Sequence, residues 1–354
     1  MIDVTHEKRL YHLLKNCGHT SHTHLYYLGD KEWFWDTAHE ALIVYRSVGK
    51  RRIVLGDPIG KSPESTRRVV EQFMTDCLEN KRIPVFYQAK AAFLPLYEKL
   101  GLQFVKIGEE AQVDLSSFHL NGKHWLKLRN RINKFLRNGY SFQVMLPPYS
   151  DSFLNRLQAI SDEWLSDRKE KSFSVGSFSP DYVSRFPVAV LVGPDGNYEA
   201  FVSIAGDHHP LRAAQEEAPV CRKITVDLMR YTKACPHGTM DVLFISLFKW
   251  AQENKYDFCS LGMAPLANAG DLLIVKLLYK YGNKLYNFKG LYDYKNKFAP
   301  KWEDVYLVYQ PATIPITVAL LALIIHRPCA NQLSQDKITS KLYMNGSSIS
   351  RKRA

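Results

Sequence analysis

The sequence lacks the close cysteine pairs that structural zinc sites use. Its six cysteines are scattered over 354 residues, and none stands in a Cys-x-x-Cys motif, so we expect no metal site. Scattered cysteines in a chain of this length are typical of reduced thiols in a cytoplasmic protein. The histidine-rich segment 1–31, which includes His22 and His24, lacks regular spacing, and we expect a helix followed by a solvated loop there.

Long hydrophobic runs are missing as well. The first ten residues, MIDVTHEKRL, contain no apolar run, so we expect that no signal peptide begins there. The longest apolar run, residues 314–325, is shorter than the roughly 20 residues that a helix needs to span a bilayer. Two interpretations of this run stay open, namely a helix buried in the core and a helix lying in the membrane interface.

Acidic residues are fewer than basic ones. The net charge of +12 and the pI near 9.2 favour an anionic partner, either nucleic acid or an anionic membrane surface. The segment 121–139 contains no acid at all, and its apolar residues recur at helical spacing. We expect a basic helix there that binds phosphates, although a solvated surface helix would have the same pattern.

The two halves of the chain show the same order of predicted elements, which indicates an internal duplication. In the first half a strand pair precedes a helix at 63–81, a strand at 83–89, a helix at 93–100 and a further strand. In the second half a hairpin and a strand precede a helix at 240–255, a strand at 257–261, a helix at 272–281 and a further strand. This order predicts α/β layers. We therefore predict one domain over residues 1–146, a second over 147–326, and a disordered polar tail over 327–354.

The stretch from residue 283 to residue 309 interleaves lysines with aromatic side chains. Lysines can bind phosphates, and aromatic rings can stack on bases or line a path for a lipid. An edge hairpin with a solvated lysine face would have the same pattern. We predict that this stretch forms the final strands of the second half, beside the strand that carries Asp227.

The segment LYEKLGLQF at 96–104 resembles the late helix–strand segment of the GCN5-related acetyltransferase fold. Two such units resemble the tandem form that aminoacyl-tRNA-dependent transferases use. The fold class implied is α/β, a tandem GCN5-related acetyltransferase-like (dupli-GNAT) fold with two mixed sheets flanked by helices. The (R/Q)xxGx(G/A) loop that binds coenzyme A in this fold is missing, because the equivalent loops read GDPIGKSPES and YTKACPHGTM. This absence counts against acyl-coenzyme A as the donor.

A more specific resemblance rests on several motifs that occur in order: GDPIG, KIGEEAQVDL, VDLMRY and YNFKGLYDYKNKFAPKWEDVY. Together they resemble the C-terminal synthase domain of bacterial phosphatidylglycerol lysyltransferases, the multiple peptide resistance factor family. The resemblance implies transfer of lysine, or in relatives alanine, from aminoacyl-tRNA such as tRNA-Lys to a hydroxyl of phosphatidylglycerol, without a cofactor. The cationic lipid product would reduce the negative charge of the membrane and confer resistance to cationic antimicrobial peptides. The resemblance also implies an N-terminal multi-span membrane domain in the full-length protein and a location at the cytoplasmic face of the membrane.

Acyl transfer from an ester to an alcohol needs a positioned hydroxyl, a proton acceptor and stabilisation of an oxyanion. The sequence has no Ser-His-Asp set with a nucleophile elbow, so we expect direct transfer. Asp227 lies in an apolar strand, where an unpartnered carboxylate is costly, although a structural ion pair with Arg230 is the alternative. His237 could act as a base or cap a loop. The candidate catalytic residues are Asp227, Arg230, Lys289 and Tyr292.

A lysyl group carries two cationic amines, so its pocket needs carboxylates. The candidates are Glu109, Glu110, Asp227 and Asp293. Because side chains alternate along a strand, Glu109 and Glu110 should face apart, and at most one should reach a given pocket. The candidates for a lipid or tRNA phosphate are Arg129, Arg131, Asn133, Lys295 and Lys297.

Two rival functions remain open at the level of the sequence. One is a tRNA-dependent aminoacyltransferase that acts on a peptide or protein acceptor. The other is a non-catalytic basic module that binds lipid or tRNA. The sequence also leaves open whether lysine or alanine is donated.

Overall fold

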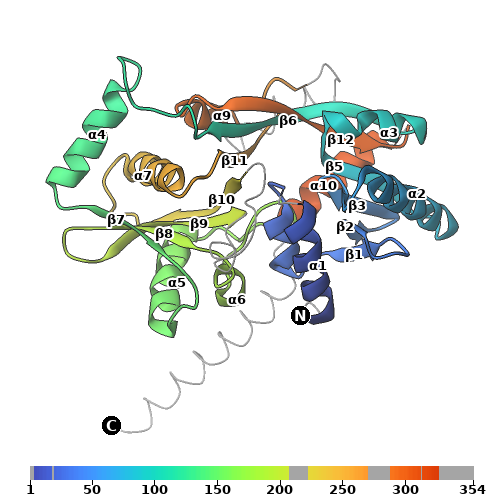
Figure 1. The fold of residues 1–354 in the computed structure, drawn as a ribbon, viewed down its shortest axis with the longest axis horizontal. Coiled ribbons are helices and arrows are strands. Elements are labelled where there is room, and N and C mark those ends of the chain that lie inside the picture. Colours follow the sequence, from blue (N-terminus) through green and yellow to red (C-terminus); the bar gives the residue numbers. More distant parts are fainter. Residues whose placement is uncertain (1–3, 18–19, 207–221, 270–287, 312, 327–354) are drawn as a thin grey trace, which may run out of the picture.

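A computed structural model of the chain describes residues 4–17, 20–206, 222–269, 288–311 and 313–326. Figure 1 shows the elements in chain order. The first half consists of α1 (Val4–Cys17), η1 (Thr23–Leu28), β1 (Glu32–Trp35), β2 (Ala41–Val48), β3 (Arg51–Leu55), β4 (Ile59–Gly60), α2 (Pro63–Glu79), β5 (Ile83–Lys90), η2 (Ala91–Phe93), α3 (Leu94–Lys99) and β6 (Gln103–Asp114).

The chain continues with the helix predicted over 121–139. The remaining elements are α4 (Leu126–Arg137), β7 (Ser141–Met145), α5 (Asp151–Leu165), α6 (Pro180–Val183), β8 (Val188–Val192), β9 (Tyr198–Gly206), β10 (Lys223–Tyr231), α7 (Thr239–Glu253), β11 (Phe258–Pro265), α9 (Phe288–Asn296), β12 (Lys301–Tyr309) and α10 (Ile314–His326). The helix predicted at 272–281 and the tail at 327–354 lie outside the described residues.

Local sequence explains why α2 begins and which side it buries. Ser62 precedes it, and the Ser62 and Ser65 side chains each accept a hydrogen bond from the other residue's backbone N–H, at 3.1 and 3.0 Å. This reciprocal cap satisfies two N–H groups that a helix start leaves unpaired. Val69, Val70 and Phe73 lie on one side of α2 and are fully buried, as the apolar spacing predicts.

The strands form one continuous sheet, where the sequence predicts two. Its 12 strands run in the order β1-β2-β3-β5-β12-β6-β11-β10-β9-β8-β7, with β4 paired to β2. The two halves meet where β6 pairs with β11 and where β12 pairs with β5 and β6. The mixed α/β class is thus confirmed, while the number of sheets is corrected. The physical reason is that backbone groups at the edge of one half are paired by the edge of the other.

The stretch predicted as final strands beside the strand of Asp227 is different in the structure. Residues 288–296 form helix α9, and only 301–309 form a strand, β12. This strand lies between β5 and β6 and is antiparallel to both, so it is neither an edge hairpin nor a neighbour of β10. Residues 283–287 lie outside the described part of the chain. The prediction failed because a strand and a short helix can both place the lysines of such a sequence on one face and the aromatic side chains on another. The sequence pattern therefore did not distinguish the two structures.

The predicted domain division at Pro147–Pro148 stays a prediction. The peptide bond between these prolines is cis and lies between β7 and α5. Four strand pairings cross the predicted division, because β7 pairs with β8, β6 pairs with β11, and β12 pairs with both β5 and β6.

Helices cover both faces of the sheet (Figure 1). Helices α1 and α10 and the short helix η1 share one apolar core with β2, β3 and β5, whereas α2 and α3 pack on a second core on the first half. Helices α4 and α7 share a third core with β8 and β9. The segment 20–28 is part of the first core, with His22 and His24 buried, so the solvated loop predicted there is wrong. Among the described residues, no helix is long and apolar enough to cross a membrane.

Candidate functional site

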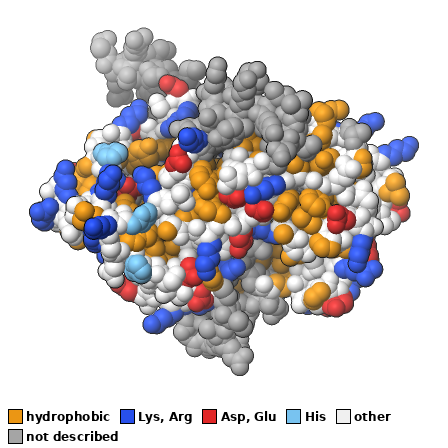
Figure 2. Space-filling model, turned by 90° about the horizontal axis from the view of Figure 1, so that it is seen from above, with side chains coloured by type: hydrophobic (Ala, Val, Ile, Leu, Met, Phe, Trp, Pro, Cys, Tyr) orange, Lys and Arg blue, Asp and Glu red, His pale blue; other side chains and the backbone are white. Residues whose placement is uncertain are grey.

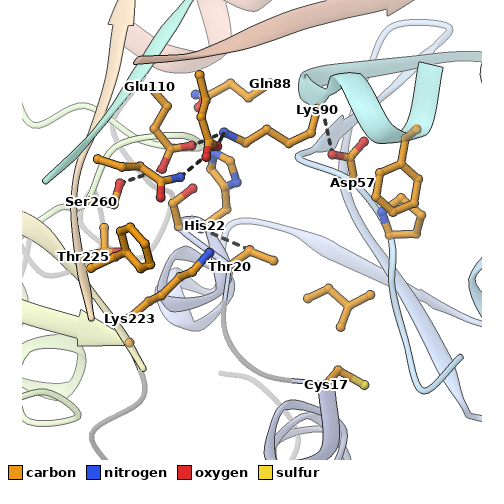
Figure 3. Close-up of a pocket in the computed structure, with 18 of the residues that line it drawn as sticks. Cys17, Thr20, His22, Asp57, Gln88, Lys90, Glu110, Lys223, Thr225 and Ser260 are labelled. Carbon is orange, nitrogen blue, oxygen red and sulfur yellow. Dashed lines mark hydrogen bonds and ion pairs between the residues drawn. The ribbon is translucent and has the colours of Figure 1, made fainter. Parts of the chain in front are cut away.

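A cavity of about 390 Å³ opens where the two halves of the sheet meet. Figure 3 shows that polar side chains from distant parts of the chain converge on it. Its walls include His22 beside η1, Asp57 after β3, Gln88 and Lys90 on β5, Glu110 on β6, Thr225 on β10, Ser260 on β11 and Glu303 on β12. The cavity therefore joins residues from both halves of the chain.

The strands around the cavity depart from regular pairing, which gives the cavity its room. Strands β10 and β11 are parallel, and they pair only over Lys223–Thr225 and Phe258–Ser260. Beyond Ser260 the register between β11 and β6 shifts by a bulge. Bulges bend a strand and re-aim its side chains. Thr225 and Ser260 lie at the point where the parallel pairing ends, and both side chains line the cavity.

Glu110 is the central buried acid of the cavity. Its side chain is only 2% exposed. It accepts hydrogen bonds from Lys90 Nζ at 2.5 Å and from Ser260 Oγ at 2.6 Å. Burial alone would raise the pKa of Glu110, but the positive charge of Lys90 and these hydrogen bonds lower it to about 2. Glu110 is thus a fixed negative charge.

Lys90 also bonds Glu303 Oε2 at 3.2 Å. The same carboxylate oxygen accepts a hydrogen bond from Gln112 Nε2 at 2.8 Å. The Glu303 side chain is half exposed, whereas the Glu110 side chain is buried. Lys90 therefore bridges one buried and one accessible carboxylate.

Asp57 is a second acid of the cavity with the opposite pKa shift. Its Oδ2 accepts a hydrogen bond from the Lys90 backbone N–H at 2.8 Å, and its Oδ1 accepts one from Tyr97 OH at 3.0 Å. Burial raises the pKa of Asp57 to about 7 in spite of these two bonds. Asp57 can therefore gain or lose a proton near neutral pH, which suits a general base.

His22 and Gln88 form a buried pair beside these acids. His22 Nε2 donates to Gln88 Oε1 at 2.8 Å, and burial lowers the pKa of His22. Gln88 has a φ of +66° inside strand β5, a left-handed conformation that costs energy for a residue with a side chain. Gly56 leaves space for the histidine, because a Cβ there would lie 3.0 Å from His22 Nδ1.

Lys295 on α9 is the only one of its predicted phosphate-binding group that is buried. Its Nζ donates to the carbonyl oxygens of Gly262 and Met263 at 2.9 and 2.8 Å. Burial lowers the pKa of Lys295 to about 7, although the Glu110 carboxylate opposes this shift. Lys295 holds the bulge of β11 behind the cavity and does not line it.

Asp227 and Arg230 lie in a second buried cluster. Asp227 accepts hydrogen bonds from Tyr182 OH at 2.8 Å and Ser203 Oγ at 3.3 Å, and His24 Nε2 is 3.4 Å away. Burial would raise the pKa of Asp227, but His24 and these bonds lower it. Gly176 passes so close that a Cβ there would lie 2.2 Å from Asp227 Oδ1.

Arg230 pairs with Glu170 at 3.0 Å and stacks over the Trp164 ring at 4.1 Å. The ion-pair partner of Arg230 is therefore Glu170, and not Asp227, which the sequence suggested. Neither Asp227 nor Arg230 lines the cavity. Their proposed catalytic role remains untested.

The other predicted acids and aromatics are dispersed. Glu109 points away from Glu110, as strand alternation predicts, and bonds Lys106 at 2.7 Å and Asn268 at 3.1 Å. Lys289 and Asp293 are exposed on α9. Tyr292 stacks on the Trp302 ring with centroids 4.4 Å apart.

The basic helix α4 uses two of its predicted phosphate ligands inside the protein. Arg129 donates to the carbonyl oxygens of Leu120 and Gly122, and Arg131 pairs with Asp241. Lys297, directly after α9, also approaches Asp241, at 3.6 Å. Asn133 is exposed. Figure 2 shows Lys and Arg side chains gathered at the end of the molecule where α4 lies.

Sequence reasoning missed most residues of the cavity. Asp57 stands in the GDPIG motif, which contributed only to the resemblance, and an acid between a glycine and a proline was the available signal. His22, Gln88 and Lys90 gave no pattern of their own. Within the described part of the chain, no three His, Cys, Asp or Glu side chains converge closely enough to hold a metal ion.

Known proteins share this fold and much of this sequence. FemX matches 90% of this chain and 98% of its own chain with a TM-score of 0.56 at 8% identity, which shows a common fold. L-PGS from Bacillus licheniformis matches with a TM-score of 0.79 and 38% identity, over 90% of this chain and 97% of that chain. The phosphatidylglycerol lysyltransferase of Bacillus subtilis is 37% identical over 326 residues, which are 90% of this chain and 37% of the relative.

The family model described as phosphatidylglycerol lysyltransferase, C-terminal, matches residues 11–309. The chain therefore belongs to the family of phosphatidylglycerol lysyltransferase C-terminal domains, as the sequence motifs predict. It spans little more than a third of the length of the Bacillus subtilis relative.

Proposed function

We propose that this chain transfers a lysyl group from aminoacyl-tRNA to a hydroxyl of phosphatidylglycerol. Family membership supports this reaction. The observation that carries it is the cavity, where the buried Glu110 carboxylate lies near the acids Asp57 and Glu303. Such a lining suits a small substrate with two ammonium groups.

The donor would place its amines against the acids of the cavity. The half-exposed carboxylate of Glu303 already accepts hydrogen bonds from Lys90 and Gln112. An incoming ammonium group can take the place of the Lys90 ammonium, and Glu303 then still has a cationic partner. Glu110 supplies the buried negative charge behind it. We keep Glu110 as a lysyl-binding residue. Glu109, Asp227 and Asp293 lie outside the cavity lining, so a role for them would be to position other groups.

The chemistry is a direct exchange of esters. The lipid hydroxyl oxygen forms a bond to the lysyl carbonyl carbon, the bond from that carbon to the ribose oxygen of the tRNA breaks, and the ribose oxygen takes up a proton. We assign the removal of the hydroxyl proton to Asp57, whose pKa of about 7 matches this task. Lys90 is a cation that can stabilise the oxyanion. Asp227, Arg230, Lys289 and Tyr292 remain candidates with no contact to the cavity.

The partners follow from the same proposal. The donor is lysyl-tRNA, bound in part by exposed side chains of α4, and the acceptor is phosphatidylglycerol at the cytoplasmic face of the membrane. The remaining two thirds of a full-length relative would include an N-terminal multi-span membrane domain. The cationic product would lower the negative charge of the membrane.

The test is a transfer assay with the purified chain, lysyl-tRNA and vesicles that contain phosphatidylglycerol. We expect a lysyl-lipid product, and we expect Glu110→Gln to lower its rate by about 100-fold because a buried charge that binds the donor is lost. Glu98→Gln is the matched control, since Glu98 is exposed on α3. Failure to form any aminoacyl-lipid from either lysyl-tRNA or alanyl-tRNA would overturn the proposal.

A further inference from the structure

Helix α10 presents an uncharged apolar face to solvent. Residues 313–325 contain no charged side chain. The exposed side chains recur at helical spacing, so they form one continuous strip: Pro315, Ile316, Ala319, Ala322 and Leu323. Ile316 is 58% exposed and Leu323 is 39% exposed. A strip of this kind is unusual on a surface that only meets water.

The opposite face of α10 fixes the helix on the protein. Thr317, Leu321 and Ile324 are buried in the core that α10 shares with α1. Thr317 Oγ1 accepts a hydrogen bond from Arg51 Nε at 3.1 Å. Ser172 donates from its N–H to the carbonyl oxygen of Ile325 at 3.0 Å and from its Oγ to that of Ile324 at 2.9 Å. The apolar strip is therefore held in a set orientation.

Cations lie next to both ends of α10. Arg51 follows the turn Gly49–Lys50. The start of β5 is bonded to this turn, because Ile83 N–H donates to Lys50 O at 2.8 Å and Arg82 Nη1 donates to Gly49 O at 2.8 Å. Lys50, Lys81 and Arg82 are exposed there. Near the other end, Arg168 and Lys169 are exposed shortly before Ser172. Exposed acids also lie near these groups: Glu32, which accepts a hydrogen bond from the Ser47 N–H, Glu79, Asp162 and Asp167.

We propose that the apolar strip of α10 docks on an anionic phospholipid bilayer, with the helix lying in the interface plane. An uncharged strip bordered by Lys and Arg has the composition of interfacial helices, in which apolar side chains enter the acyl boundary and cations meet lipid phosphates. A second copy of the chain would bring the same cations against each other, which disfavours a symmetric pair through this face. The bilayer is thus the partner that the charges fit.

Docking at α10 would place lipid headgroups beside the cavity. Helix α1 packs on the same core as α10, Figure 1 shows the two helices next to each other, and Cys17 at the end of α1 lines the cavity. This link between docking and lipid acylation rests on the proposed function. The docking itself does not require that the chain be active.

The test compares vesicle binding of the full chain with that of a double variant, Ile316→Glu and Leu323→Glu. We expect the wild-type chain to sediment with vesicles that contain phosphatidylglycerol and less with purely zwitterionic vesicles. We expect the double variant to bind about 10-fold more weakly or worse, because membrane binding scales with the apolar area that is buried. The matched control is Leu146→Glu with Tyr231→Glu, at positions 57% and 41% exposed outside α10.

A second measurement separates docking from chemistry. Transfer to short-chain phosphatidylglycerol dissolved as single molecules should stay within about twofold in the double variant, whereas transfer to vesicles should fall with binding. Should the glutamates unfold the chain, Ile316→Ser with Leu323→Ser replaces them. Unchanged vesicle binding in a folded variant, or no binding by the wild type, would overturn the docking. Self-association that is lost in the variant would point to a second copy and overturn it too. Binding without transfer to either lipid would overturn the proposed function alone.

Discussion

At the scale of single residues, the cavity separates its acids by environment. Glu110 has a lysine and a serine as partners, and its pKa is about 2. Asp57 has only a backbone N–H and a tyrosine hydroxyl, and its pKa is about 7. One acid can therefore bind a cation at all physiological pH values while the other exchanges a proton.

The pH dependence of transfer tests the role of Asp57. A base must be ionised, so the rate should rise as pH passes through about 7, the pKa of Asp57. Asp57→Asn should lower the rate by about 100-fold or more and remove this rise. Lys295 also titrates near pH 7, so Lys295→Met serves as the control. A rise that survives in Asp57→Asn and vanishes in Lys295→Met would assign the titration to the lysine.

The stability of variants at Asp227 distinguishes a structural role from a catalytic one. The folded state lowers the pKa of Asp227, so its contribution to stability is present above the unfolded pKa and is lost as pH falls through the folded pKa. Asp227→Asn should reduce the free energy of unfolding by about 2 kcal/mol at pH 7. The difference from wild type should shrink as the pH is lowered below about 4.

Chemical denaturation at pH 7 and at low pH measures both effects. The exposed Asp293 supplies the control, since Asp293→Asn should change stability by no more than about 0.5 kcal/mol. A variant at Asp227 that keeps its stability but loses transfer would show a direct part in the reaction.

At the scale of elements, α4 combines two tasks that its sequence does not separate. Arg129 and Arg131 serve internal contacts, whereas Lys127, Lys134 and Arg137 are exposed, as is Lys123 shortly before the helix. Only the exposed set is available to tRNA phosphates. The helical period shows which face is apolar, but it does not show which cations find partners on neighbouring segments.

Charge reversal on α4 should weaken tRNA binding. Lys127→Glu with Lys134→Glu should lower affinity and reduce the slope of log affinity against log salt concentration by about 1 to 2, because two phosphate contacts are lost. Lys99→Glu on α3 is a matched control at an exposed site. Titration of fluorescent tRNA-Lys at several salt concentrations gives the slope. An unchanged slope would exclude α4 as a phosphate-binding helix.

At the scale of the whole molecule, β12 decides how the halves are joined. It comes late in the chain, and it pairs with β5 and β6 of the first half. Val305 and Val308 on β12 are fully buried, and Leu307 is 1% exposed. Without β12, the central strands β5 and β6 would each lose one of the two strands that they pair with.

Separate expression of the halves tests this dependence. Residues 1–146 alone should show no cooperative unfolding transition, because β5 and β6 would expose unpaired backbone groups and apolar side chains. Co-expression with residues 147–354 should restore a folded complex. Circular dichroism during thermal unfolding measures the transition. A fragment 1–146 that unfolds cooperatively by itself would show that the first domain is independent of β12.

The sequence by itself determined the α/β class, the family, the apolar faces of α2 and α4, and the opposite orientation of Glu109 and Glu110. These features depend on local periodicity or on ordered motifs, which are readable along the chain. Only the tertiary structure decided that 288–296 is a helix, that β12 enters the first half, and that Asp57, Glu110 and Glu303 meet in one cavity. The physical reason is that strand partners, burial and pKa shifts depend on contacts between distant segments, such as Lys90 and Glu303, which are 213 residues apart. Local sequence does not encode those contacts.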